Sequence, residues 1–229
     1  MLIRQFARPG NSVREISFIP HVTRSADGSC VIKAGNTHVL CTASLDVGTT
    51  GLHVEFGQVP SAQHPRISRA EMLSSFETQH TQHAVRQSLT LAVDGDVLSK
   101  VGIYLDCDVL QSEGGIFSSC ISGGFVAMAL ALKKWAGSAV VSKTPLVNQI
   151  AGISCGLIKG EMILDLDQQE AIESDVLGDF IFSSDDQVVG IHIKSQRYAV
   201  SFGQIHEMSN LALRGVRSIL DAQKRCLNG

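Results

Sequence analysis

The segment DVLQSEGGIFSSCISGG, residues 108–124, combines the residue types of a turn that could bind an anion. Two glycines permit a tight turn after an apolar run, and two serines supply hydroxyl groups where a helix would begin: Gly114, Gly115, Ser118 and Ser119. Backbone N–H groups at such a helix start point outward, and this arrangement suits a phosphate. The alternative is a tight turn that opens a buried helix with Phe117 packed inside. We favour it, because Ile116 and Phe117 offer no side-chain donor.

A second candidate lies in the segment ETQHTQH, residues 77–83. Glu77, His80 and His83 recur every three residues, so they would share one face of a helix. Together with His64 they could bind a transition metal or supply a base. The alternative is a polar first turn that faces solvent, which histidines at this spacing more often form. We favour this alternative.

A third candidate is an acidic run that contains Asp165, Asp167, Glu170, Glu173, Asp175 and Asp179. One interpretation is the remnant of a general-acid and metal site, with Asp175 and Asp179 as the candidate catalytic residues. The other interpretation is a solvated loop after a hairpin, which acidic runs usually are.

The elements that would position these residues follow from hydrophobic periodicity and turn residues. Expected hairpins cover residues 28–45, 150–166 and 179–195, and expected single strands cover residues 52–60 and 100–111. Expected helices cover residues 78–93, 118–134 and 202–226, and the middle one is apolar nearly all round, as a core helix is. Strands interspersed with helices in this order predict an α+β fold, a mixed sheet with packed helices, in a single domain over residues 1–229.

The composition restricts the class of protein. The chain has 229 residues, 44% of them hydrophobic, and a net charge of −3, so charge alone would not hold a nucleic acid. The six cysteines form no CxxC pair and no zinc-finger spacing. The longest apolar run, Phe125–Leu132, is too short to span a bilayer, and no signal peptide is visible. We expect a soluble protein of a reducing compartment, most simply the cytoplasm, with no membrane partner.

Six segments, taken in order, resemble the ribonuclease PH family: GSCVIKAGNTHVLCTASL, VEFGQVPSAQHPRISRAE, LDCDVLQSEGG, GFVAMALAL, GLIKGEMILDLD and LALRGVRSILDAQK. The resemblance implies a phosphorolytic 3′→5′ exoribonuclease that trims RNA, notably the 3′ ends of transfer RNA, using inorganic phosphate and Mg²⁺. It also implies a ring of six built from dimers, of like or unlike subunits. The residues left that could contact RNA phosphates are His64, Arg66, Arg69 and Arg86. Equally, the first three could be ordinary loop charges.

The sequence departs from the family at the phosphate site. Phe117 stands where the family has an arginine after the paired glycines, and Glu77 stands where it has a second arginine. The last family acid falls on Leu177 in one register, or on Asp175 if a gap is allowed. The Gly48–Gly51 loop is shorter and lacks the family's arginines.

These departures favour one of two functions. A charge-assisted hydrogen bond contributes roughly 1.5–3 kcal/mol, and an arginine can make two, so losing both arginines removes most of the hold on phosphate. We therefore expect a catalytically impaired or non-catalytic ring or scaffold subunit of the family. The alternative is an active phosphorolytic exoribonuclease that trims transfer RNA 3′ ends.

Overall fold

The structure is a computed structural model that describes residues 4, 8–62, 65–66, 68–73, 75–141 and 145–229. Among these residues a five-stranded sheet has the order β1-β2-β3-β5-β4, and a four-stranded sheet has the order β7-β6-β8-β9. The first sheet consists of β1 (Ile16–Pro20), β2 (Gly28–Ala34), β3 (Thr37–Asp46), β4 (Gly51–Gln58) and β5 (Gly102–Gln111). The second consists of β6 (Ile150–Ile158), β7 (Glu161–Leu164), β8 (Val176–Ser183) and β9 (Val188–Ser195).

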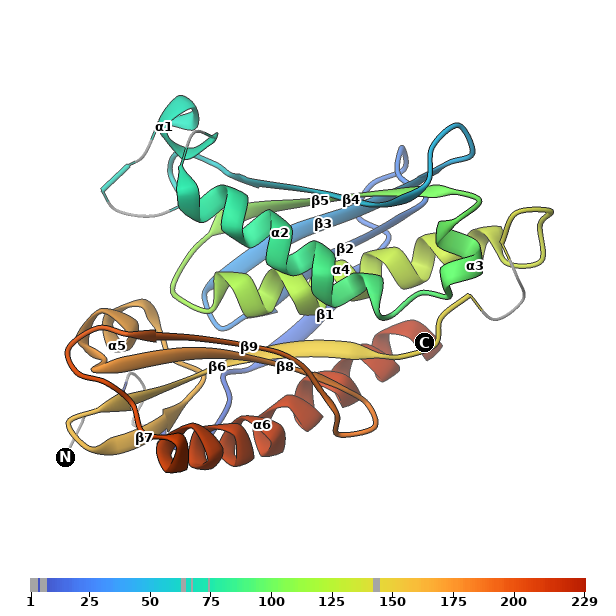
Figure 1. Ribbon diagram of the computed structural model, residues 1–229. Coiled ribbons are helices and arrows are strands. Elements are labelled where there is room, and N and C mark those ends of the chain that lie inside the picture. Colours follow the sequence, from blue (N-terminus) through green and yellow to red (C-terminus); the bar gives the residue numbers. More distant parts are fainter. Residues whose placement is uncertain (1–3, 5–7, 63–64, 67, 74, 142–144) are drawn as a thin grey trace.

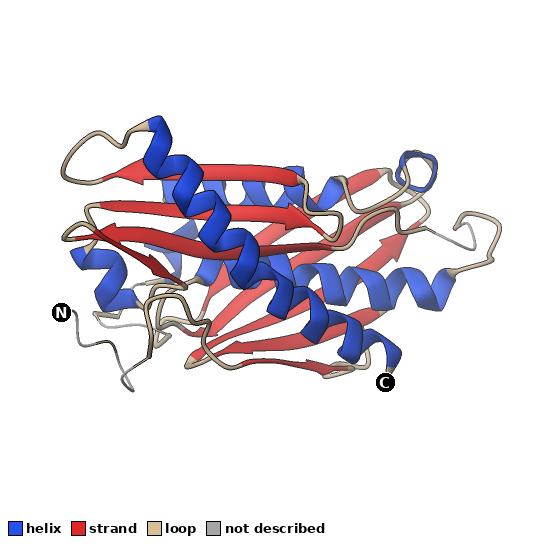
Figure 2. Ribbon diagram, turned by 90° about the horizontal axis from the view of Figure 1, so that it is seen from below, coloured by secondary structure: helices blue, strands red, loops and turns tan. Residues whose placement is uncertain are grey.

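Six helices lie in the described part of the chain. They are α1 (Arg69–Leu73), α2 (Phe76–Thr90), α3 (Gly95–Leu98), α4 (Ile116–Trp135), α5 (Gln168–Glu173) and α6 (Phe202–Asn228). Figure 1 shows α2 and α4 between the sheets, and Figure 2 shows α6 crossing the outer face of the second sheet. The first sheet is mixed, since β4 is parallel to β5 while its other pairs are antiparallel. The α+β fold with a mixed sheet and packed helices is confirmed.

Helix α4 is the centre of the molecule. It packs on β2, β3 and β5 of the first sheet and on β6 of the second, so both of its sides meet apolar side chains. Its length and hydropathy alone would also suit a membrane span, but 83% of that window is buried inside the protein. Burial on all sides explains why its sequence is apolar without a polar face.

The predicted elements form with shifted ends. The three hairpins are β2–β3, β6–β7 and β8–β9. Helix α2 begins two residues earlier than predicted, because Ser75 caps it by accepting a hydrogen bond from the Thr78 N–H. The periodicity did not reveal β1, whose five residues alternate between half-buried and exposed. The single domain expected for residues 1–229 stays a prediction.

The acidic run was interpreted as a solvated loop, and this interpretation is wrong, because its central carboxylates are buried. Asp165, Asp167 and Glu170 are each at most 5% exposed. Arg4 pairs with Glu170 at 2.5 Å, and Arg14 pairs with Asp165 at 2.8 Å. Asp167 and Glu170 also form a capping box at the start of α5. The run therefore ties the N-terminal segment to the second sheet, a long-range pairing that composition alone does not reveal.

Candidate functional site

The turn before α4 is held in a conformation that favours glycine. Gly114 and Gly115 have φ angles of 88° and 68°, in the left-handed region. A β-carbon on Gly114 would also lie 2.6 Å from the backbone of Asp167. The Thr37 hydroxyl donates to the Gly114 carbonyl at 2.7 Å, and the Arg14 guanidinium donates to the carbonyls of Glu113 and Gly114. The direction of the turn is therefore fixed by side chains from β3 and the N-terminal segment.

The start of α4 keeps part of an anion site. No side chain caps the helix, so its first N–H groups are not taken up by a capping residue. Ser118 and Ser119 are buried, 8% and 3% exposed, and do not project into solvent. The Ser118 hydroxyl donates to a carboxylate oxygen of Asp179 at 3.1 Å. The predicted phosphate-binding segment is thus the start of α4, and its Ser118 hydroxyl is hydrogen-bonded to Asp179.

Asp179 is the carboxyl group at this site. It lies on β8, opposite Ser154 of β6 and His192 of β9. Burial raises the pKa of Asp179 to about 6, and the hydrogen bond from Ser118 lowers it in part. A carboxyl group with this pKa can accept or release a proton close to neutral pH, as a general base or acid requires.

Asp175, the other candidate catalytic residue, lies away from the start of α4. One of its carboxylate oxygens accepts hydrogen bonds from the Lys159 N–H at 2.9 Å and the Tyr198 hydroxyl at 3.1 Å. Arg197 donates to the other oxygen at 3.2 Å. These bonds, that from Lys159 first, hold the pKa of Asp175 below its usual range. Four residues of extended strand separate Asp175 from Asp179 by about 13 Å. The structure therefore brings Asp179, and not Asp175, to the start of α4.

Aromatic rings surround the place where the resemblance implies arginines. Phe117 packs against the core and meets the ring of His192 edge to face, with ring centroids 5.3 Å apart. The ring of His80 also meets that of His192 edge to face, with centroids 5.6 Å apart, and the centroid of Phe76 lies 6.2 Å from that of His80. Glu77 is exposed at the start of α2. The first turns of α2 and α4 and the strand β9 thus meet at one site.

These residues do not fit an inorganic phosphate well. Burial, and the neighbouring His80, lower the pKa of His192, so this ring is neutral near pH 7 and supplies no cation. Asp179, with a pKa of about 6, is mostly ionised there and repels an anion. The helix start alone remains to attract phosphate, and its dipole contributes only about 0.3–1 kcal/mol at an exposed site.

The residues also do not fit a divalent metal. Asp175 is occupied by Lys159, Tyr198 and Arg197, and Asp179 by Ser118. Among the described residues no group of three His, Cys, Asp or Glu side chains could hold an ion. His83 instead approaches Arg86, 3.4 Å from one of its guanidinium nitrogens. No chemical step is assigned to a metal.

Three of the four residues predicted to contact RNA lie in the described part of the chain, on a loop and two helices. His64 lies outside the described residues. Arg66 is exposed in the loop after β4, and Arg69 begins α1. Arg86 lines a hollow of about 830 Å³ between α2, β4 and β9, together with His53 and His192. Arg86 and the aromatic rings thus share His192 as a common neighbour.

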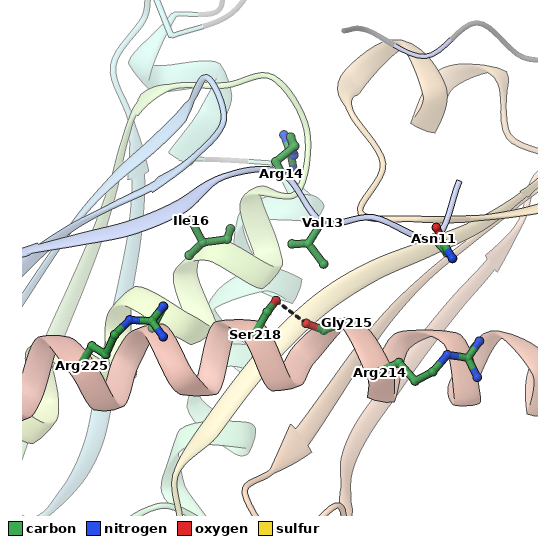
Figure 3. Close-up of a pocket in the computed structure, with 9 residues that line it drawn as sticks. Asn11, Val13, Arg14, Ile16, Arg214, Gly215, Ser218 and Arg225 are labelled. Carbon is green, nitrogen blue, oxygen red and sulfur yellow. Dashed lines mark hydrogen bonds between the residues drawn. The ribbon is translucent and has the colours of Figure 1, made fainter. Parts of the chain in front are cut away.

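Another hollow, of about 510 Å³, lies away from α2 and β9. Figure 3 shows the segment of Asn11 and Val13 on one side and α6 with Arg214 and Arg225 on the other. Arg14, which also lines it, is engaged with Asp165. The hollow contains none of the residues predicted for the site.

His192 and Phe76 were missed by sequence reasoning. His192 sits in VVGIHIKS, an alternating strand pattern, and nothing in that pattern says which helix the strand will face. Phe76 directly precedes Glu77 in the sequence, and nothing in its position indicates a role at the site. The available signal was the pairing of β8 with β9, which places His192 opposite Asp179. That register depends on a bulge near Phe182, which periodicity does not locate.

Known proteins are similar to this chain over nearly its whole length. The model for the 3′ exoribonuclease family, domain 1, matches residues 12–134, and that for domain 2 matches residues 148–215. Ribonuclease PH of Cereibacter sphaeroides is 32% identical over 236 residues, which cover 98% of this chain and 100% of the relative. Ribonuclease PH of Roseobacter denitrificans is 34% identical over 233 residues, which cover 97% and 98%.

Solved structures share the fold at lower identity. Rice (Oryza sativa) Rrp46 has a TM-score of 0.78 at 16% identity, over 98% of this chain and all of the other. An Archaeoglobus fulgidus exosome with RNA bound to the active site gives a TM-score of 0.75 at 16% identity, over 95% and 91%. On the two family models and the full-length relatives above 30% identity, this chain belongs to the 3′ exoribonuclease family that includes ribonuclease PH.

Proposed function

We propose that this protein is an RNA-processing subunit of a ribonuclease PH-type assembly whose own phosphorolytic site is impaired. The observation that carries the proposal is that Phe117, at the start of α4, and Glu77, at the start of α2, stand where the family has arginines. Phosphoryl transfer depends almost wholly on positioning and electrostatic stabilisation. At this site the His192 ring is neutral, Asp179 is ionised and Glu77 is exposed, so the site offers a phosphate dianion little positioning and little electrostatic stabilisation.

The proposal extends to an assembly. The structural neighbours include chains described as an exosome core, and this chain keeps their fold over 96% of its length. Retention of the whole fold, with the phosphate site altered, is what a ring or scaffold subunit requires. Partners would be like or unlike subunits of the same fold, with RNA as the ligand. We place the protein in the cytoplasm, in line with six cysteines that are all free thiols.

Three observations favour the second candidate, an active phosphorolytic exoribonuclease acting on transfer RNA 3′ ends. The Gly114–Gly115 turn is retained, the start of α4 is uncapped, and Asp179 has a pKa of about 6. In this case inorganic phosphate would be a substrate held by backbone N–H groups alone, since the acids do not assemble an Mg²⁺ site among the described residues.

The test is to incubate the purified protein with a 3′-extended transfer RNA, with and without inorganic phosphate, and to identify the products. We expect no phosphate-dependent nucleoside diphosphates. Their release at ordinary enzymatic rates, on the order of 1 s⁻¹ or more, would establish the second candidate instead. The double variant Phe117→Arg with Glu77→Arg serves as the comparison, because it returns both cations, and calorimetry should show stronger phosphate binding than in the native protein.

A further inference from the structure

The surface between the N-terminal segment and α6 is hollowed, and this hollow of about 510 Å³ is here called the α6 groove. Figure 3 shows its two walls, the chain from Asn11 to Ile16 on one side and α6 on the other. The residues of α6 that line it follow one side of the helix: Arg214, Gly215, Ser218, Ala222 and Arg225. Phe117, Asp179 and His192 do not line the groove, so it is not part of the candidate functional site.

The charged side chains that line the α6 groove are, among the described residues, all arginines: Arg14, Arg214 and Arg225. Arg14 is paired with the buried carboxylate of Asp165. Arg214 and Arg225 are exposed, and neither side chain forms an ion pair or a hydrogen bond within the described part of the chain. Although the net charge of the protein is −3, the groove therefore presents two cations to an anionic ligand.

The middle of the α6 groove is lined by apolar and small side chains. Val13 and Ile16 are half-buried on the N-terminal wall, and Gly215 and Ala222 lie on α6. The Ser218 hydroxyl donates to the Gly215 carbonyl at 2.8 Å, shown by the dashed line in Figure 3, so it is already hydrogen-bonded within the helix. A ligand would therefore meet an apolar surface between two positive ends.

The spacing of the two arginines restricts the ligand. Arg214 and Arg225 are three turns of α6 apart, which is about 16 Å. One phosphate ion cannot reach both guanidinium groups. A single RNA strand carries a phosphate at every nucleotide, so it would leave a phosphate over Val13 or Ile16 with no cation beside it. An anionic ligand with an apolar group between its charges fits the groove better.

We propose that the α6 groove binds an extended acidic segment of a partner protein, with two carboxylates four residues apart on Arg214 and Arg225. In an extended chain such residues point to the same side, about 13 Å apart, and the flexible charged side chains span the remainder. The residue midway between the two acids also faces the groove, and an apolar side chain there would pack on Val13 and Ile16.

The partner is a different protein. In this sequence two acids lie four residues apart at Glu161 with Asp165 and at Asp175 with Asp179, and the carboxylates of Asp165 and Asp179 are buried. A second copy of this chain therefore does not offer the required segment. The inference goes beyond the proposed function and does not depend on RNA or on phosphorolysis.

The experiment measures binding of the fluorescein-labelled peptide Gly-Glu-Ser-Leu-Ser-Glu-Gly by fluorescence anisotropy at low salt. The control peptide, Gly-Ser-Leu-Glu-Glu-Ser-Gly, has the same composition and charge, but its glutamates are adjacent and cannot reach both arginines. We expect saturable binding of the first peptide, about threefold tighter or more than that of the control, since an exposed ion pair contributes up to about 1 kcal/mol.

Three single variants make the test specific. Arg214→Gln and Arg225→Gln should each lower the affinity for the first peptide about threefold, and the two together about tenfold, because distant sites act additively. Arg217→Gln is the matched control, since Arg217 lies on the same helix but pairs with Asp186 and does not line the groove. It should leave the affinity unchanged.

The inference fails on any of three results. The first is no saturable binding, or equal affinity for the two peptides. The second is an equal loss in Arg217→Gln, which would show a general effect of positive charge. The third is that Arg214→Gln and Arg225→Gln weaken binding of a labelled oligouridylate, or lower the mass measured by light scattering. Either change would assign the groove to RNA or to a second copy of this chain.

Discussion

The buried carboxyl group of Asp179 makes the free energy of unfolding depend on pH, because its pKa differs between the folded and unfolded states. It lies on β8 between β6 and β9, where it accepts a hydrogen bond from Ser118 of α4 and has Ser154 and His192 as its partners on the neighbouring strands. Burial raises its folded-state pKa to about 6 from an ordinary value of 3.8. The folded state therefore holds this proton more tightly than the unfolded chain does.

The sign of the effect on stability follows from that difference. As pH rises from about 4 to 6, the folded state binds more protons than the unfolded state, so the free energy of unfolding falls. Asp179→Asn removes the charge and should be more stable than native protein above pH 6, by up to about 3 kcal/mol, and equal to it below about pH 4. Urea unfolding at a series of pH values measures this, and a constant difference at every pH would contradict it.

The buried ion pair between Arg4 and Glu170 is expected to stabilise the folded protein. The two side chains are 2% and 6% exposed, and Arg4 also donates to the carbonyls of Pro9, Leu164 and Asp165. Arg4→Met leaves the buried Glu170 carboxylate without its main partner, and should lower the free energy of unfolding by about 3 kcal/mol or more. The exposed pair of Arg217 with Asp186 is the control, and Arg217→Met should change stability little.

At the scale of elements, the close approach of β2 to α4 determines the packing of the first sheet. A β-carbon on Gly28 would lie 2.1 Å from the Ala127 carbonyl oxygen and 2.5 Å from the Ala131 nitrogen. Both contacts are with backbone atoms of α4, which cannot rotate aside. Glycine at this position therefore permits the helix to lie directly on the strand.

Gly28→Ala should accordingly lower the melting temperature, with a loss of about 2–3 kcal/mol or more, since overpacking forces backbone shifts. Gly95→Ala is the matched control because nothing lies within 4 Å of a β-carbon there and its φ is not positive. It should be neutral or slightly stabilising. Equal effects of the two substitutions in thermal unfolding would show that the helix–strand contact is not the cause.

At the scale of the whole molecule, charge limits the affinity for RNA. The net charge is −3, and the arginines predicted to contact RNA are Arg66 in the loop after β4, Arg69 at the start of α1 and Arg86 on α2. The protein alone should bind RNA weakly, and a partner subunit could supply further positive charge.

If about three of these cations contact phosphates, the affinity for single-stranded RNA should fall with salt at a log–log slope of roughly −2. Arg66→Ala and Arg86→Ala should each make the slope shallower, while Arg217→Ala on α6 should not. Anisotropy over a salt series measures the slopes. Tight binding that is insensitive to salt and to both substitutions would place the RNA path elsewhere.

The fold also predicts self-association or pairing with a homologous subunit. The chain keeps the family's fold over nearly its whole length. Because the Gly48–Gly51 loop is short, we expect a dimer more readily than a full ring of six. Multi-angle light scattering should give a mass above the 24.5 kDa of one chain. A monomer at micromolar concentration with no copurifying partner would contradict this.

The sequence by itself determined the α+β class, the three hairpins and the central apolar helix. These depend on local periodicity and turn residues such as Gly160, which act within a few residues of each other. It also identified Gly114–Ser119 as the helix start at the candidate site, and Phe117 and Glu77 as departures from the family.

Only the tertiary structure decided which side chains meet. The acidic run became a buried network because Arg4, Arg8 and Arg14, about 150 residues away in the chain, lie against it. Asp179, and not Asp175, reached Ser118 because β8 pairs between β6 and β9 in one register. His192 joined Phe117 for the same reason. Contacts of this kind depend on the packing of distant segments, which the spacing of residues along one chain does not specify.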